Sequence, residues 1–80
     1  MNIQLIDGNF SQNEALELLT QLIHVKIKFH ESKIEKSQNE EYIKMRERRI
    51  KQLQQSFYEA KQLILAKNKT CHIESQVMVS

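Results

Sequence analysis

The sequence predicts a mainly α-helical protein, in which a long antiparallel helical hairpin is flanked by a short β-strand at each end, in the order β-α-α-β. The 80-residue chain has no proline, one glycine and many residues that tolerate helix interiors. Two long segments carry apolar residues at helical spacing, and short apolar-rich segments precede and follow them. A chain of this length has room for one domain, so we expect residues 1–80 to fold as a single unit.

The first expected strand covers residues 2–6, and the stretch 7–9 after it indicates a turn, because its glycine can adopt a positive φ. The first expected helix covers residues 11–36. Ser11 and Glu14 have the spacing of a capping box, in which the serine hydroxyl accepts from a backbone N–H of the first turn and the glutamate reaches back. This signal places the start of the helix.

The second expected helix covers residues 38–67, and Ser37 with Glu40 forms another sequence match to a capping box. Asn68 is suited to end this helix in the left-handed conformation that glycine usually supplies. The alternating stretch 71–79 predicts a C-terminal strand. Because a helical hairpin returns the chain to its start, we expect the terminal strands to lie close enough to pair, either within one chain or between chains.

Each expected helix carries an apolar row at alternating spacings of three and four, as in a coiled coil. Folding the chain near Ser37 pairs the two rows as Ile34 with Ile43, His30 with Arg46, Ile27 with Ile50, Ile23 with Leu53, Leu19 with Phe57 and Leu16 with Ala60. Every layer is apolar except the polar layer of His30 and Arg46. That layer could fix the register or respond to pH, but we favour two side chains that reach the edge of the helix pair, with Glu31 or Glu47 neutralising the arginine.

The first helix has a second apolar row that finds no counterpart on the second helix. Its members are Ala15, Leu18, Leu22, Val25 and Phe29. Burying this row would contribute on the order of 5–8 kcal/mol per chain before entropy costs, which is comparable to the whole stability of a small domain. We therefore expect a homodimer that forms a four-helix assembly through these residues; the alternative is that the terminal strands cover them within one chain.

A basic cluster on the second helix is the strongest hint of a charged partner. It consists of Lys44, Arg46, Arg48, Arg49 and Lys51. Arginine favours bidentate contacts with phosphate or carboxylate groups, so the cluster could contact nucleic acid or an acidic protein. Nearby glutamates favour a simpler interpretation as a solvated helix face, and no helix-turn-helix spacing or aromatic platform accompanies the cluster.

The residues that could carry chemistry are few. The soft metal ligands are Cys71, His24, His30 and His72, and their positions in the expected hairpin do not converge within one chain, so we predict no metal site and no cofactor. Cys71 has no base placed to activate it, and the chain has no glycine-rich phosphate loop. These observations argue against an enzyme.

The N-terminal segment has no basic region followed by a long apolar stretch, so we expect neither a signal peptide nor a membrane span. The expected location is the cytoplasm, where Cys71 would stay reduced. We therefore expect a non-enzymatic, homo-oligomeric helical interaction or adaptor protein with an unidentified protein partner. The alternative is a nucleic-acid-binding accessory protein that uses the basic cluster.

Overall fold

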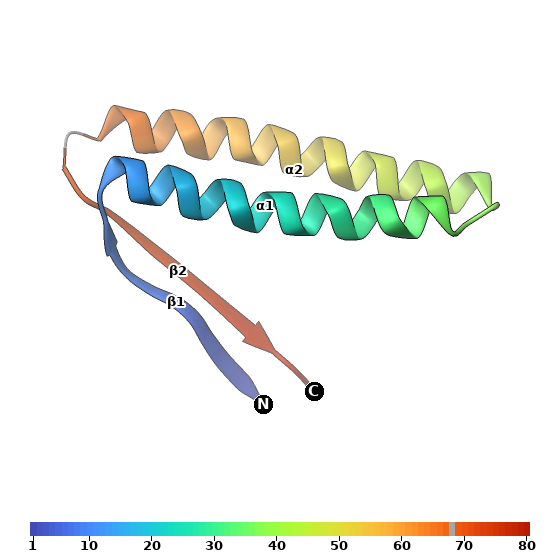
Figure 1. Ribbon diagram of the computed structural model, residues 1–80, viewed down its shortest axis with the longest axis horizontal. Helices are drawn as coiled ribbons and strands as arrows, with labels where there is room; N and C mark the ends of the chain where they lie inside the picture. The colour runs from blue at the N-terminus through green and yellow to red at the C-terminus, as the bar shows by residue number, and fades with distance from the viewer. Residues whose placement is uncertain (68) are drawn as a thin grey trace.

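A computed structural model describes residues 1–67 and 69–80 of the chain, and its elements follow the predicted β-α-α-β order (Figure 1). The elements are β1 (Asn2–Phe10), α1 (Gln12–Glu35), α2 (Glu40–Ala66) and β2 (Cys71–Met78). The helices lie side by side as an antiparallel hairpin, and the strands pair as a two-stranded antiparallel ribbon. Neither helix is long and apolar enough to cross a membrane, within the residues that the structure describes.

The start of α1 forms the predicted capping box. The Ser11 hydroxyl accepts a hydrogen bond from the Glu14 amide at 3.2 Å, and the Ser11 amide donates to the Glu14 carboxylate at 3.1 Å. The hydrogen bonds from Ser11 lower the pKa of Glu14, since they favour its charged form. Ser11 and Lys36 act as cap residues, so the helix is one residue shorter at each end than predicted.

The start of α2 differs from the prediction, because Asn39 and not Ser37 caps it. The Asn39 side chain accepts from the Tyr42 amide at 3.0 Å, and the helix begins at Glu40. The Ser37 hydroxyl instead accepts from the Asn39 amide at 3.2 Å and orders the loop between the helices. Asparagine caps helices as well as serine does. Asn39 directly precedes the helix, so it sets the N-terminal boundary of α2.

The end of α2 is held by the start of α1. The side-chain amide of Gln12 donates to the carbonyl oxygens of Ile64 and Leu65 at 3.3 Å each, and it also donates to the carbonyl of Lys67. The Ile64 carbonyl also accepts from the Lys67 amide at 3.2 Å. Carbonyls in the last turn of a helix lack the usual partners further along the helix, so the Gln12 side chain helps to satisfy them and closes the base of the hairpin. The expected cap at Asn68 lies outside the described residues.

The predicted turn at residues 7–9 is wrong, because β1 continues as a strand to Phe10 and pairs with β2 over this whole stretch. Gly8, the one glycine of the sequence, does not adopt a positive φ and lies in the ladder opposite Ile73. The ladder extends from Asn2 to Phe10 of β1, with one irregularity between Gln4 and Ile6. Pairing with a second strand has overridden the local preference of the sequence for a turn.

A β-bulge between Gln4 and Ile6 gives the ribbon one apolar face. In a regular strand Ile3 and Phe10 would point to opposite faces, because they are seven positions apart and side chains alternate. The extra residue shifts the alternation by one, so both lie on the same face. The cross-strand pairs on this face are Ile3–Val77, Ile6–Ser75, Gly8–Ile73 and Phe10–Cys71.

The core is small and lies where the ribbon joins the helices. Its buried apolar residues are Ala15, Ile64 and Cys71, and Phe10, Leu16, Leu19 and Ile73 pack around them as partly buried neighbours. Away from this junction the ribbon diverges from the helices and ends freely with both termini (Figure 1). The Cα positions span 47 × 31 × 13 Å, so the molecule is one layer of secondary structure thick.

Candidate functional site

The extra apolar row of α1 faces the open side of the molecule. We call Leu18, Leu22, Val25 and Phe29 the open stripe. Val25 is 68% exposed and Phe29 is 55% exposed, whereas Leu18 and Leu22 are half-buried. Ala15, which the sequence analysis placed with them, is fully buried in the core instead, because the ribbon joins the hairpin there.

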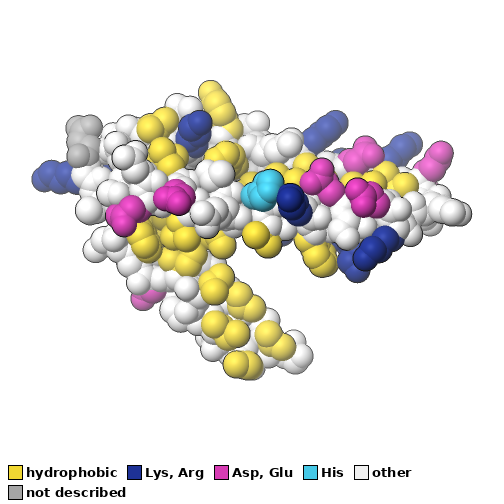
Figure 2. Space-filling model, viewed as in Figure 1, with side chains coloured by type: hydrophobic (Ala, Val, Ile, Leu, Met, Phe, Trp, Pro, Cys, Tyr) yellow, Lys and Arg dark blue, Asp and Glu magenta, His cyan; other side chains and the backbone are white. Residues whose placement is uncertain are grey.

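The ribbon does not cover the open stripe. Phe10 lines a shallow groove with Leu18 near the start of α1, but Leu5 is 53% exposed and Val79 is 54% exposed. Figure 2 shows apolar side chains along the ribbon and along the edge of the helices, with an open notch between the two. The structure therefore does not follow the expected alternative, in which the terminal strands fold over the stripe within one chain.

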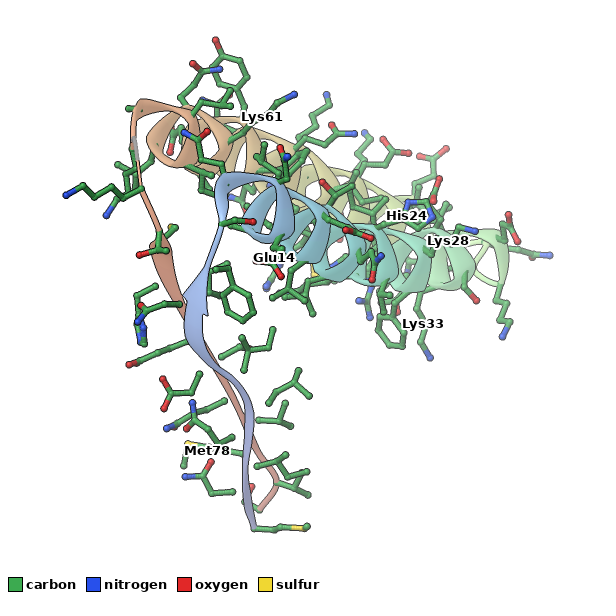
Figure 3. The ribbon with its side chains drawn as sticks, turned by 60° about the vertical axis from the view of Figure 1, so that its left-hand side comes forward. Glu14, His24, Lys28, Lys33, Lys61 and Met78 are labelled. Carbon is green, nitrogen blue, oxygen red and sulfur yellow. The ribbon has the colours of Figure 1, made fainter. Side chains whose placement is uncertain are left out.

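The other face of the ribbon is polar. Met78 is the apolar exception on this face (Figure 3), and the Gln76 side chain donates to the Gln4 side chain at 2.7 Å. The two faces of the ribbon are thus distinct, and the apolar face is the one turned toward α1.

The polar layer forms inside the hairpin as a direct contact. An Arg46 Nη1 donates to His30 Nδ1 at 3.0 Å, and the Arg46 Nη2 donates to the Tyr42 hydroxyl at 2.7 Å. The guanidinium also lies 5.0 Å from the centre of the Tyr42 ring and 5.9 Å from that of Phe29. His30 is only 6% exposed, so the expectation that both side chains reach the edge of the pair is wrong.

Arg46 forms no ion pair with an acidic residue among residues 1–67 and 69–80. Its Nε is buried without a hydrogen-bond partner, and neither Glu31 nor Glu47 pairs with it. Among the described residues, the ion pairs that form involve only His72 on the ribbon. The polar layer is therefore a partly buried cation held by neutral groups and aromatic rings.

The surroundings of His30 favour its neutral form. Burial lowers the pKa of His30 most, and the nearby charges of Arg46, Lys26 and Arg49 lower it further. An arginine nitrogen can only donate, so Nδ1 is the acceptor and the neutral ring carries its proton on Nε2. The tautomer of His30 is thus set by its contact with Arg46.

The basic cluster of α2 is divided among three surroundings. A helix turns by roughly 100° per residue, so neighbouring bases leave it in different directions. Arg46 enters the polar layer, and Arg49 faces a cleft between the helices. Lys44, Arg48 and Lys51 share a shallow outer groove with Glu47. The cluster that is continuous in sequence is therefore not one surface.

The cleft that Arg49 faces has a volume of about 270 Å³ and draws side chains from both helices. We call it the basic cleft, and it is lined by Lys26, His30, Arg49, Gln52, Leu53 and Ser56. No carboxylate is among these lining residues. Sequence reasoning missed this site, because Lys26 and Arg49 lie on different helices and come together only in the folded hairpin.

A second cluster lies on the polar face of the ribbon. His72 Nε2 is 3.2 Å from an Asp7 oxygen and 3.0 Å from a Glu74 oxygen, and its Nδ1 is 3.1 Å from the Asn9 side chain. One imidazole and two carboxylates could ligate a divalent cation such as zinc. Without a cation, hydrogen bonds from the His72 ring can bridge the same oxygens. The side chains of His72, Asp7 and Glu74 are between half and two-thirds exposed.

Sequence reasoning missed this cluster, since it assigned Asp7 to a turn. The signal that could have found it is the spacing of His72 and Glu74, which are two apart and so share a strand face. His24 is not part of the cluster and projects from α1 (Figure 3), while Cys71 is buried in the core. Of the four soft metal ligands named from the sequence, His72 lies in this cluster, whereas Cys71, His24 and His30 lie elsewhere.

The fold and these surfaces define a β-α-α-β protein with an open apolar face and a cationic helix interface. No protein-family model matches the sequence, and the searches of curated proteins and of solved structures also find no match.

Proposed function

We propose that this protein is a non-enzymatic, homo-oligomeric interaction protein, and that a second copy of the chain covers the open stripe and the apolar face of the ribbon. The observation that carries the proposal is that both apolar surfaces bound the same open notch and neither covers the other. Contiguous apolar surfaces of this kind usually mark a protein-protein interface.

The exposed area supports a second copy as the partner. The chain exposes 6546 Å², whereas a compact monomer of 9.5 kDa would expose about 5,000 Å². The excess of roughly 1,500 Å² per chain exceeds the roughly 800 Å² per partner of a standard interface and falls in the range of obligate dimers. The radius of gyration of 15.0 Å also exceeds the about 12 Å expected for 80 compact residues.

The thin core supports a permanent partner over an occasional one. The described part of the chain has three buried apolar residues, which are few for a protein that must offset the conformational entropy of 80 residues. A second copy is present whenever the protein is made, so it can supply the missing layer at all times. The four helices of two copies would then form the centre, and the outer face of α2 would stay available to another protein.

The remaining chemistry fits a binding role in the cytoplasm. Cys71 is a free, buried thiol, which suits a reducing compartment and offers no accessible nucleophile. The clusters at the polar layer and on the ribbon hold charged groups without a nucleophile and base in contact.

Sedimentation equilibrium of the wild-type protein at micromolar concentration tests this proposal. We expect a mass of at least two chains, and we expect the variant Val25→Lys/Phe29→Lys to shift it toward one chain, because two charges on the open stripe oppose burial. The matched control is Tyr58→Lys/Leu63→Lys, which adds the same charges to exposed apolar positions of α2. A folded, monomeric wild-type protein would contradict the proposal.

A further inference from the structure

The basic cleft is the place where cationic side chains of both helices converge. Lys26 comes from α1 and Arg49 comes from α2, and Gln52 and Ser56 add an amide and a hydroxyl that can donate hydrogen bonds. None of the lining residues is acidic. Cationic hydrogen-bond donors that have no carboxylate beside them favour the binding of an anion.

His30 gives the cleft a donor of fixed orientation. Its ring is nine-tenths buried, and its Nδ1 is occupied by Arg46. The proton on Nε2 is therefore the one left for the cleft, and no hydrogen bond to Nε2 forms within the part of the chain that the structure describes. A donor whose side chain is held in place by a second side chain needs no reordering when a ligand binds.

The charged side chains that line the cleft, Lys26 and Arg49, are both cationic. Arg46 lies behind His30 with no carboxylate partner, so its charge adds to those of Lys26 and Arg49. Burial lowers the pKa of His30 most, and these three cations lower it further. An anion in the cleft would relieve this repulsion.

We propose that the basic cleft is a binding site for a phosphate-class anion, with Lys26 and Arg49 supplying charge and His30 Nε2 supplying an oriented hydrogen bond. The donors belong to two facing helices, so they approach a ligand from opposite sides, which suits the several oxygens of a tetrahedral anion better than the planar pair of a carboxylate. The cleft volume of about 270 Å³ leaves room for such an anion together with bound water.

The outer groove of α2 provides a natural comparison. It contains Lys44, Arg48 and Lys51, which is one more cation than Lys26 and Arg49 supply, but Glu47 lies among them. A charge count alone would therefore favour the outer groove. The proposal favours the basic cleft, because its charges are uncompensated and its histidine is preorganised.

Proton NMR titration of the three histidines in the presence and absence of inorganic phosphate tests the site directly. We expect millimolar phosphate to raise the pKa of His30, since a nearby dianion favours the protonated ring, and to leave His24 and His72 unchanged. The same titration with acetate tests whether a carboxylate binds equally well. A titration with a phosphate monoester tests whether esterified phosphate is also bound. An equal response to acetate would overturn the assignment to phosphate.

The variant Lys26→Gln/Arg49→Gln should weaken phosphate binding by about tenfold or more, because two charge-assisted hydrogen bonds are lost. The control Lys44→Gln/Arg48→Gln removes the same formal charge from the outer groove and should leave the phosphate response of His30 intact. Circular dichroism confirms that both variants are folded. If phosphate leaves the pKa of His30 unchanged, or if both variants weaken binding equally, the proposal fails.

Discussion

At the scale of single residues, His30 is a buried titratable group that faces cations and no carboxylate. Lys26 on its own helix and Arg46 and Arg49 on the facing helix all disfavour its protonated form. Its pKa in the folded protein therefore lies below the ordinary value of 6.5. The unfolded chain binds a proton more readily at this position, so the layer couples folding to pH.

We expect the free energy of unfolding to fall as the pH is lowered from above 6.5 toward the depressed pKa of His30. The stabilising contribution is fully present above the unfolded pKa and is lost progressively below it. Urea unfolding between about pH 7.5 and pH 5 measures this slope, and His30→Gln should flatten it. His24→Gln, at an exposed position of the same helix, should keep the wild-type slope, and an unchanged slope in His30→Gln would contradict the prediction.

At the scale of elements, local signals set the helix boundaries well and the strand boundaries poorly. The capping box at Ser11 depends on residues three apart, so the sequence alone predicts it. The extension of β1 to Phe10 depends on pairing with a strand more than sixty residues away, so the turn preference around Gly8 was misleading. The start of α2 shows the limit of local signals, because Ser37 and Glu40 match a capping box in the sequence, whereas Asn39 caps the helix in the structure.

We expect Asn39→Ala to destabilise the protein by about 1 kcal/mol, since it removes the side-chain acceptor of the Tyr42 amide. Ser37→Ala removes a hydrogen bond within the loop and leaves the cap in place, so its effect should be smaller. Chemical unfolding of both variants gives the comparison. A larger loss for Ser37→Ala would mean that the helix begins at the serine, as the sequence pattern had indicated.

At the scale of the whole molecule, the open stripe and the basic cleft differ in how far the sequence could predict them. The stripe lies on one helix, so its spacing identified Leu18, Leu22, Val25 and Phe29 before any packing was known. The basic cleft joins Lys26 to Arg49 across two helices, and it required the register and the side-chain directions of the folded hairpin. The basic cluster of α2 is divided for the same reason, since Arg46 is drawn into the polar layer by His30 on the facing helix.

A one-layer molecule with an uncovered apolar face should gain its stability from association, and this links the unfolding temperature to concentration. A tenfold increase in protein concentration favours an assembled dimer by about 1.4 kcal/mol. For a dimer of two 80-residue chains, this corresponds to a rise in Tm of roughly 3–6 °C. Calorimetry or circular dichroism over a hundredfold range of concentration measures the rise.

The same measurement on Val25→Lys/Phe29→Lys separates association from other effects. This variant should have a lower Tm that does not depend on concentration, because its folded form can no longer be stabilised by a second copy. The control Tyr58→Lys/Leu63→Lys should keep the dependence of the wild type. A wild-type Tm that is constant across the range would show that a single chain, despite its three buried apolar residues, is stable on its own.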